Sequence, residues 1–348
     1  MKVILNTPNP FMLAHGGAQI QLEQAWAALE KLGVQVEPLR WWDDKQTGDI
    51  FHYLGRIPIQ MCRLAQAKGM KVVMADLLTG QGSRSDLRLG LERVIRRVVT
   101  PVVPRAVAAH FHWESYRIAD ACVAGTPREA QIMKDAFRAP PERVHVVPNG
   151  VEEVFFESPA VPRGRWLVCT ATITERKKVL ELAKAAMEAE SPLWIIGKPY
   201  SEQDPYFRAF TELAAAHPGR LRYEGPMADR KRLAQAYREA RGFVLLSTME
   251  TLSLSALEAS ACQCPLLLSD LPWATSFFGE HASYCPVPPG RQAVKVLRSF
   301  YETAPALRPP PKPLTWLDIG RQFKAIYESL LNAEGGRAAT SRKSAQTS

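Results

Sequence analysis

The 348-residue sequence contains no long hydrophobic run, and this absence excludes several classes of protein. A membrane-spanning helix needs about 18 or more consecutive apolar residues, and no such stretch occurs. The first residues, MKVILNTPNPF, carry one Lys and an apolar run too short for the core of a secretory signal peptide. We interpret them as a first β-strand. The dinucleotide-binding pattern G-x-G-x-x-G is also missing, which argues against an NAD-dependent enzyme.

Cysteine is scarce, and none of the six cysteines forms a C-x-x-C pair. Several lie inside apolar runs, which is typical of buried free thiols in a reducing cytoplasm. Cys262 and Cys264 are too close together for an ordinary zinc half-site, and no His cluster accompanies them. The sequence therefore predicts no metal site.

Basic residues exceed acidic ones, with 44 Lys and Arg against 35 Asp and Glu and a net charge of +9. This excess favours an anionic partner, which could be a nucleotide, a phospholipid surface or a nucleic acid. The hydrophobic fraction of 46% and the charged fraction of 23% are those of an average globular protein. At about 150 residues per domain, the length predicts two domains.

Short β-rich runs alternate with helical patterns in both halves of the chain. The expected strands of the first half are 2–5, 34–38, 49–53, 71–75, 121–124 and 143–147, and the expected helices are 17–31, 57–67, 86–99 and 127–137. In the second half the expected strands are 166–171, 193–196, 220–223, 243–246, 266–268 and 283–285, and the expected helices are 177–190, 206–217, 229–240 and 252–262. This order predicts an α/β protein with two Rossmann-like, doubly wound domains facing a central cleft, since ligands of such sheets bind outside the C-terminal strand ends.

Turn and proline signals divide the chain into four parts. We expect an N-terminal domain over 1–157 and a C-terminal domain over 158–308, because 158–164 contains two Pro and a Gly. Five Pro fall within 305–313, so this segment is expected to be non-helical. A helical pattern resumes from 316, giving a closing segment over 309–332, and the residues 333–348 are expected to form a flexible basic tail.

The densest set of chemically useful residues is E-T-L-S-L-S-A-L-E, from Glu250 to Glu258. Glu250 falls in the loop that leaves a strand, and Glu258 falls in the second turn of the next helix. The first turn of that helix presents free backbone N–H groups, which suit a phosphate, whereas carboxylates suit vicinal sugar hydroxyls. The element could therefore hold a nucleotide-sugar. The simpler interpretation is a solvated Glu258 and a Glu250 that only caps the helix.

This stretch resembles the E-x7-E signature of retaining glycosyltransferases with the two-Rossmann GT-B fold, especially glycosyltransferase family 4. The matching positions are Ser247, Glu250, Leu254, Leu257, Glu258, Ala259, Ala261 and Pro265. The resemblance implies that Glu250 lies near the donor sugar and that Glu258 holds the ribose. It also assigns donor binding to the intervening residues Thr251, Leu252, Ser253 and Leu254. Thr251 and Ser253 replace two glycines of the family pattern, and their side chains either restrict the approach of the phosphates or add hydroxyl donors.

The segment A-T-I-T-E-R-K-K from Ala171 to Lys178 is similar to the donor phosphate loop of the same family. The resemblance implies that Arg176 and Lys177 neutralise the leaving diphosphate, with Thr172 beside it. Such a preorganised positive charge can replace a metal ion. The alternative is a solvated basic first turn of a helix, which the helix dipole disfavours.

The pair Gly16-Gly17 resembles the family's N-terminal glycine loop, whose backbone faces the donor phosphate and the acceptor. Two glycines permit positive φ and a close approach of a ligand. The segment 143–151 resembles the family's hinge, and the helix after 316 resembles its closing helix, which packs back on the N-terminal domain. The resemblance is strong across 165–285 and loose across 40–120.

Many family members carry a His after the fourth N-terminal strand, and this chain has none there. Asp76 is a candidate substitute, and His110 and His112 are candidates from a neighbouring helix. No Asp-x-Asp motif occurs, which is in keeping with a metal-independent transferase without a cofactor.

Six Arg fall within residues 84–105, where Leu87, Leu91, Val94, Ile95 and Val98 repeat at helical spacing. A basic amphipathic helix can lie on an anionic membrane surface, and a core-packed helix with a charged outer face is the alternative. No nucleic-acid-binding motif accompanies the charge, so a nucleic-acid partner is not expected.

Together these features predict a cytoplasmic, retaining glycosyltransferase, with peripheral contact at the inner face of a membrane. It would transfer a sugar from a nucleoside diphosphate sugar to a saccharide or lipid-linked acceptor hydroxyl, in glycan, glycolipid or cell-envelope polysaccharide synthesis. The alternatives are a nucleotide-sugar epimerase or hydrolase on the same fold, and a non-catalytic sugar-nucleotide-binding protein descended from such enzymes.

Overall fold

The structure, a computed structural model, describes residues 1–8, 16–99, 113–157 and 161–345, and it describes no side chains for 95–99 and 334–345. The chain forms two compact units, each described here by itself. The N-terminal unit comprises Met1–Gln81, Asp86–Asn149 and Trp316–Ser348, and the C-terminal unit comprises Gly82–Ser85 and Gly150–Thr315.

The N-terminal unit is built on a six-stranded parallel sheet with the order β2-β1-β3-β4-β5-β6. Its strands are β1 (Lys2–Asn6), β2 (Gln35–Pro38), β3 (Ile50–Leu54), β4 (Lys71–Ala75), β5 (Ala121–Ala124) and β6 (Val144–Val146). The central strands are nearly continuous apolar runs and are buried, because helices cover a parallel sheet on both faces. The strand order changes direction between β1 and β3.

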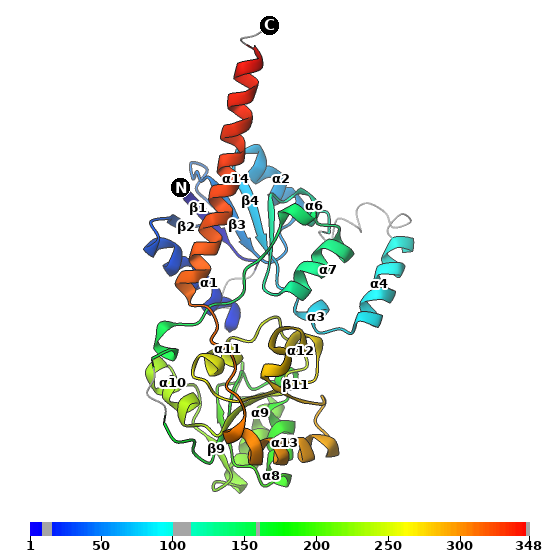
Figure 1. Ribbon diagram of the computed structural model, residues 1–348, viewed down its shortest axis with the longest axis vertical. Helices are drawn as coiled ribbons and strands as arrows, with labels where there is room; N and C mark the ends of the chain where they lie inside the picture. Colours follow the sequence, from blue (N-terminus) through cyan, green and yellow to red (C-terminus); the bar gives the residue numbers. More distant parts are fainter. Residues whose placement is uncertain (9–15, 100–112, 158–160, 346–348) are drawn as a thin grey trace. The chain divides into compact units, whose positions relative to one another are not determined.

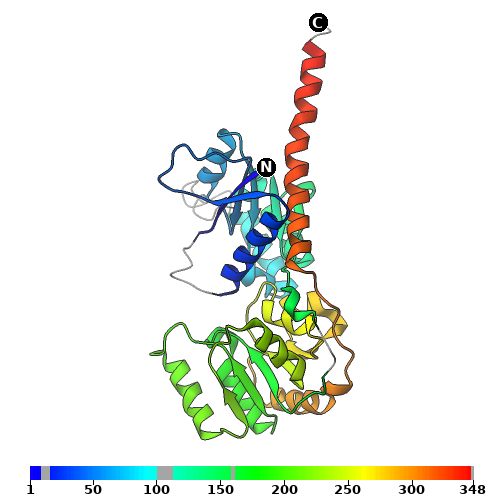
Figure 2. The ribbon, with the colours of Figure 1, turned by 90° about the vertical axis from the view of Figure 1, so that its left-hand side faces the viewer.

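The helices of this unit are α1 (Gly17–Lys31), α2 (Ile59–Ala67), α3 (Thr79–Gly82), α4 (Asp86–Val99), α6 (Ser115–Ile118), α7 (Pro127–Phe137) and α14 (Trp316–Ala345). Helix α14 runs alongside α1, although the two are almost 300 residues apart in sequence (Figures 1 and 2). Gly320 permits this packing, because a Cβ atom there would come within 3.0 Å of the Ala28 Cβ. The buried His52 of β3 shares a hydrogen bond of 2.6 Å with the Tyr327 hydroxyl of α14.

The C-terminal unit has a second six-stranded parallel sheet, with the order β12-β11-β10-β7-β8-β9. Its strands are β7 (Leu167–Thr170), β8 (Leu193–Ile196), β9 (Leu221–Tyr223), β10 (Gly242–Leu245), β11 (Leu266–Ser269) and β12 (Ser283–Cys285). Its α-helices are α8 (Val179–Glu188), α9 (Pro205–Ala216), α10 (Arg230–Glu239), α11 (Leu254–Ala261), α12 (Pro272–Phe278) and α13 (Arg291–Thr303). The strand order changes direction between β7 and β10, and in such a sheet this is the place where ligands bind.

Short 3₁₀ segments complete the two units. They are η1 (Pro141–Arg143), η2 (Glu153–Phe155), η3 (Glu175–Lys177), η4 (Gly279–His281) and η5 (Ala304–Ala306). In the described part of the chain, no helix combines the length and the apolar character needed to cross a membrane.

The predicted α/β class with two Rossmann-like, doubly wound sheets is confirmed, and the twelve strands fall where the sequence predicts them to within two residues at each end. The helices differ from the prediction in three ways. The helix expected over 177–190 begins only at Val179, after the separate turn η3, because Lys178 adopts a left-handed conformation with φ 53°. Helices α3, α6, α12 and α13 are absent from the prediction, and α14 continues to Ala345, so residues 333–345 are helical where the sequence predicts a flexible tail.

Candidate active site

The candidate site lies in the C-terminal unit, where the loops that follow β7 and β10 leave adjacent strands. Parallel pairing of Phe243 with Val168 sets these strands side by side, so their C-terminal ends meet at the switch point of the sheet. The first loop, 171–178, carries Arg176 and Lys177, and the second, 246–253, carries Glu250. Topology alone therefore brings the two predicted motifs to one edge.

Hydrogen bonds join these two loops. The backbone N–H of Thr248 donates to the Arg176 carbonyl at 2.9 Å, and its hydroxyl donates to the same oxygen at 3.0 Å. In return, Nη1 of Arg176 donates to the Met249 carbonyl at 2.6 Å. The position of each loop thus depends on the other, which fixes the geometry of the charged groups they carry.

Arg176 and Lys177 both contact a single carboxylate, that of Glu250. The Arg176 Nη1 lies 3.2 Å from Oε1 of Glu250, and the Lys177 ammonium donates to the same oxygen. Glu250 is only 9% exposed, so this carboxylate is not a solvated helix cap. Two cations beside one anion leave a net positive charge, which is the arrangement expected of an anion-binding site.

The two cations stand before helix α8 rather than inside its first turn. They belong to η3, and Lys178 separates them from α8 through its left-handed backbone. They therefore do not form the first turn of α8, and both pair with Glu250. The loop also lies very close to Gly197, the residue after β8. A Cβ atom at Gly197 would come within 1.9 Å of the Ala171 carbonyl oxygen. Only glycine permits that approach.

Glu258, the second acidic residue of the motif, is buried, and each of its carboxylate oxygens accepts a hydrogen bond from another side chain. Its Oε1 accepts a hydrogen bond from the Arg230 guanidinium, and its Oε2 accepts one from the Tyr237 hydroxyl at 3.1 Å. Burial raises the pKa of Glu258, and Arg230 and Tyr237 oppose that rise. The solvated interpretation of Glu258 is therefore wrong. No sequence motif marks Arg230 or Tyr237, although their spacing of seven places them on one face of α10.

The residues between the two acids have different environments. Ser253 is the N-cap of α11, and its hydroxyl accepts from the Ala256 N–H at 3.3 Å. Leu252 is buried in the core, whereas Thr251 and Leu254 are half-buried. Thr172 is half-buried in the loop after β7. The Ser253 hydroxyl thus already serves the helix terminus, so of the two substituted glycines only Thr251 presents a hydroxyl with no such role.

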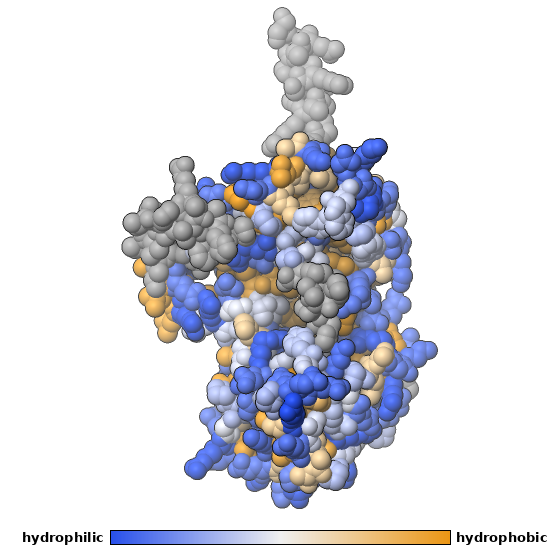
Figure 3. All heavy atoms as spheres, turned by 180° about the vertical axis from the view of Figure 1, so that it is seen from behind, coloured by the Kyte–Doolittle hydropathy of each residue, from blue (hydrophilic) through white to orange (hydrophobic). Residues whose placement is uncertain are grey.

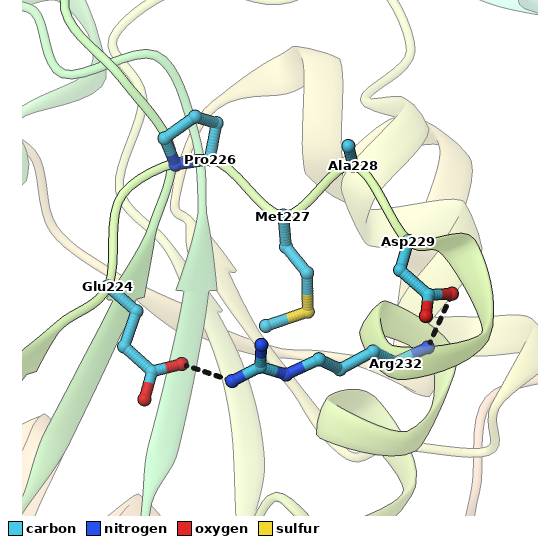
Figure 4. Close-up of a pocket in the computed structure, with 6 residues that line it drawn as sticks. All are labelled: Glu224, Pro226, Met227, Ala228, Asp229 and Arg232. Atoms are coloured by element: carbon cyan, nitrogen blue, oxygen red, sulfur yellow. Dashed lines mark hydrogen bonds and ion pairs between the residues drawn. The ribbon is translucent and has the colours of Figure 1, made fainter.

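A cavity of about 370 Å³ opens at the C-terminal end of β9, next to the start of α10. It is lined by Glu224, Pro226, Met227, Ala228, Asp229 and Arg232 (Figure 4). Arg232 donates to Glu224 at 3.2 Å, and Asp229 caps the helix by accepting from the Arg232 N–H at 3.2 Å. The close-up shows the Met227 side chain pointing toward the Arg232 guanidinium (Figure 4). The cavity therefore combines an apolar wall with paired charges.

In the N-terminal unit, the predicted Gly16-Gly17 turn follows β1, at one side of the switch point of that sheet. Gly16 is the N-cap of α1 with φ 151°, a conformation that favours glycine, and apart from its chain neighbours no atom of the described residues lies within 4 Å of the place where its Cβ would be. Gly17 is the first residue of α1. The first turn of this helix therefore has no side chain at two successive positions.

Asp76 follows β4 and is closed in by its neighbours. Its Oδ2 accepts from Arg56 Nε at 3.1 Å and from the Tyr116 hydroxyl. The Arg56 guanidinium also stacks over the rings of Tyr116 and Phe137. Asp76 is therefore part of a buried ion-pair cluster, which a lone acidic residue in the sequence does not reveal. His110 and His112 lie outside the described residues.

Glu129 of α7 is a further buried acid near this cluster. It accepts from the backbone N–H groups of Leu78 at 3.0 Å and Gly125 at 3.0 Å, and so links the ends of β4 and β5. Burial raises its pKa to about 7. The pattern T-P-R-E at Thr126–Glu129 is a capping box, and this signal could have identified Glu129 from sequence.

All six cysteines are buried and free, as the apolar context of the sequence predicts, and burial raises the pKa of each described Cys thiol to about 12. Within the described residues, no three His, Cys, Asp or Glu side chains are grouped so that they could hold a metal ion.

Comparisons with known proteins show which sequences this chain resembles. Residues 164–297 match the family model described as "Glycosyl transferases group 1". A D-inositol 3-phosphate glycosyltransferase of Jonesia denitrificans is 31% identical over 197 residues, which is 49% of this chain and 46% of that protein. The chain thus matches about half the length of this curated relative.

Solved structures show a similar fold over nearly the whole chain. A sucrose-phosphate synthase from Thermosynechococcus elongatus has a TM-score of 0.64 at 17% identity, covering 95% of this chain and 99% of that one. Anabaena HepE in complex with UDP has a TM-score of 0.62 at 13% identity, covering 96% and 99%. At these identities the likeness shows the fold alone.

Both motifs on which the predicted resemblance depends, 171–178 and 250–258, lie inside the family match. The resemblance and the GT-B architecture are confirmed, whereas membership of family 4 stays a prediction. Residues 164–297 thus resemble a group 1 glycosyltransferase domain, in a chain with the two-sheet GT-B fold.

Proposed function

We propose that this protein is a retaining glycosyltransferase that moves a sugar from a nucleoside diphosphate sugar to an acceptor hydroxyl. In this proposal Arg176 and Lys177 bind the diphosphate and stabilise its departure. Glu250 orients the donor sugar, and Glu258 accepts hydrogen bonds from the ribose hydroxyls.

One observation carries the proposal, namely that two cations converge on Glu250 at the switch point of the C-terminal sheet. A departing nucleoside diphosphate gains negative charge. Fixed positive groups at that place therefore stabilise the transition state more than the ground state, and this lowers the barrier. Arg176 and Lys177 would supply this charge themselves, which makes the proposed reaction independent of a metal ion and of a cofactor. Solved structures of Anabaena HepE hold UDP or UDP-glucose, which supports a nucleotide-sugar as the donor class.

The proposed acceptor is a saccharide or a lipid-linked hydroxyl bound by the N-terminal unit. Gly16 and Gly17 leave the first turn of α1 open to a ligand, whereas Asp76 is already paired with Arg56. Departure of the diphosphate would precede or accompany attack by the acceptor on the same face of the sugar. We place the reaction in glycan, glycolipid or cell-envelope polysaccharide synthesis.

We further propose that the protein works in the cytoplasm and contacts an anionic membrane through α4. Leu87, Leu91 and Val94 recur at helical spacing and are 89%, 62% and 58% exposed. The opposite side of α4 is held by the unit, because the half-buried Leu89 packs against the core and Arg93 forms an ion pair with Asp135 at 3.0 Å. Hydrophobic side chains are visible on this part of the surface in the space-filling view (Figure 3). An exposed apolar face flanked by Arg favours an anionic lipid surface over a protein core.

The reaction is tested by incubating the protein with UDP-, GDP- and ADP-sugars and a panel of acceptors, in wild type and in Glu250→Ala. We expect transfer by the wild type with retention at the anomeric carbon, and a loss of about 10² to 10³ in kcat for the variant. Affinity for the nucleoside diphosphate should be unchanged or higher in Glu250→Ala, because the carboxylate that competes for Arg176 and Lys177 is gone.

Equal transfer rates in the two proteins would refute the role of Glu250. Release of free or epimerised sugar without acceptor would indicate the hydrolase or epimerase instead. Donor binding without any turnover would indicate a sugar-nucleotide-binding protein.

A further inference from the structure

The buried Glu258 belongs to a linear chain of polar groups that extends from the edge of the C-terminal unit into its core. Glu152, which precedes η2, contacts Arg230, Arg230 contacts Glu258, and Glu258 contacts Tyr237. The Arg230 Nε donates to Glu152 Oε1 at 2.8 Å, and its Nη2 donates to Glu258 Oε1. One guanidinium therefore links two acids from different segments, which a single exposed salt bridge does not do.

Arg230 is itself held in place. Its guanidinium lies over the Phe155 ring, with the Cζ atom 4.7 Å from the ring centroid. It is also the first residue of α10, whose N-terminus is fixed by the Asp229 cap. A planar guanidinium that stacks on a ring and donates from two different nitrogens has one orientation available, so its contact with Glu258 is preorganised.

We propose that Arg230 is a positioning residue for donor binding, which keeps Glu258 ionised and oriented so that its two remaining acceptor sites receive the ribose hydroxyls. The proposal rests on the function proposed above, in which Glu258 binds the ribose.

The count of acceptor sites supports this role. A carboxylate has about four lone-pair sites, two on each oxygen. Arg230 occupies one site on Oε1, and Tyr237 occupies one on Oε2. One site remains on each oxygen, which matches a vicinal pair of hydroxyl donors. A protonated Glu258 would offer fewer sites and would present an O–H donor to one of those hydroxyls.

The surroundings of Glu258 make its ionisation depend on Arg230. Burial raises the pKa of Glu258, and the charge of Glu152 raises it further, whereas Arg230 and Tyr237 lower it. Cys262, which follows α11, stays neutral because burial raises its pKa to about 12. Among the described residues Arg230 is the cation that acts most strongly on Glu258, and without it the carboxyl would hold its proton at a higher pH.

The experiment compares wild type, Arg230→Met and the matched control Lys231→Met by calorimetric titration with UDP, GDP and ADP between pH 6 and pH 9. Lys231 is the exposed neighbour of Arg230 on the same helix, so its replacement removes the same charge without touching Glu258. We expect Arg230→Met to weaken binding of the preferred nucleotide about tenfold or more at pH 7, since loss of the cation raises the pKa of Glu258 further and leaves less of the carboxyl ionised. Affinity should recover toward pH 9, and Lys231→Met should match the wild type.

A double-mutant cycle separates positioning from a general structural role. In the Glu258→Gln background, Arg230→Met should cause no further loss, because the group through which Arg230 acts is already neutral. Arg230→Lys keeps the charge but cannot reach both acids with a planar fork, so it should lose less than Arg230→Met. It also provides a milder variant if Arg230→Met does not fold, as judged by near-ultraviolet circular dichroism.

Two outcomes would overturn the role of Arg230. One is binding by Arg230→Met within twofold of wild type at every pH, and the other is a pH-independent loss that persists in the Glu258→Gln background. A wild-type protein that binds none of the three nucleotides is a different result, because it would overturn the proposed function itself.

Discussion

The two units place the same structural feature at the same point of the fold and use it differently. Each has a six-stranded parallel sheet whose strand order changes direction, between β7 and β10 in one unit and between β1 and β3 in the other. In the C-terminal unit two cations share one carboxylate at that edge, whereas in the N-terminal unit Arg56 is matched by Asp76. The fold provides the place, and the local charge balance decides whether an anion can bind there.

The acids of the two units differ in the same way. Glu258 is engaged by Arg230 and Tyr237 but keeps a free site on each oxygen. Glu129 accepts from two backbone N–H groups of the N-terminal unit and has no cation among the causes of its shifted pKa. We therefore expect substitutions in the C-terminal cluster to change binding and catalysis, and substitutions in the N-terminal cluster to change stability.

The largest expected effect follows from removing one of the two cations that share the Glu250 carboxylate. Lys177→Met should reduce kcat by about 10³, because one of the two groups that meet the departing diphosphate is lost from a preorganised site. The measurement is a turnover assay with saturating nucleotide-sugar, together with the thermal unfolding midpoint. Lys184→Met is the matched control, since Lys184 is an exposed Lys on helix α8. If Lys177→Met retained full turnover, the excess positive charge at the C-terminal site would have no role in catalysis.

The corresponding change in the N-terminal unit is Arg56→Met. It should lower the free energy of unfolding by about 3 to 4 kcal/mol, because Asp76 and Tyr116 would be left buried without their cation. Affinity of the C-terminal unit for nucleoside diphosphate should stay within twofold of wild type. Urea denaturation and nucleotide titration measure the two quantities. A stable Arg56→Met with weakened nucleotide binding would reverse the assignment of the two clusters.

A smaller effect is expected from the pH dependence of Glu129. Its pKa is about 7 in the folded protein against an ordinary value of 4.5, so the unfolded chain holds fewer protons between these values. The free energy of unfolding therefore falls as pH rises from about 4.5 to 7, by at most about 3 kcal/mol from this group. The buried His52, with a pKa of about 3, acts in the opposite sense between about 3 and 6.5.

The test compares wild type with Glu129→Ala, measuring the free energy of unfolding against pH. The difference between the two profiles separates the contribution of Glu129 from that of His52. The slope of unfolding free energy against pH should become more positive in the variant between pH 5 and 7. Parallel profiles for the two proteins would show that Glu129 titrates in its ordinary range.

The two units also show which features of the structure can be predicted from the sequence. Periodicity and β-branched runs predict both sheets, because a buried parallel strand has a strong local signal. Motif spacing predicts Arg176, Lys177 and Glu250 as a group, because each residue follows a strand end of the same sheet. These signals are local, and they need no knowledge of the neighbours of each side chain.

The partners of Glu258 and Asp76 have no local signal in the sequence. Arg230 is 28 residues from Glu258, and Tyr116 is 40 residues from Asp76, so these contacts exist only after the chain has folded. The sequence also does not predict the turn η3, because the backbone conformation that separates it from α8 has no local signal. Lys178 is a non-glycine residue in a left-handed conformation, and composition favours a continuous helix there. Helix α12 has only seven residues and lies beside short apolar runs that do not distinguish helix from strand. Helix α13 does carry a local signal, because its buried residues Ala293, Leu297 and Phe300 recur at helical spacing.

The two units also differ in the hydrophobic side chains that they expose to solvent. The smallest effect that we predict, on binding to vesicles, follows from this difference. Most of the exposed large hydrophobic residues in the described part of the chain belong to the N-terminal unit, among them Leu64, Leu87 and Leu91. If α4 contacts an anionic membrane, Leu91→Asp should weaken binding to vesicles of phosphatidylglycerol and phosphatidylcholine about tenfold, since it removes an apolar contact and adds a repelled charge. Leu64→Asp is the matched control, because Leu64 of α2 is 66% exposed and Leu91 is 62% exposed. Equal loss for both variants in a vesicle co-sedimentation assay would show that any exposed leucine of this unit serves as well, and α4 would then be an ordinary surface helix.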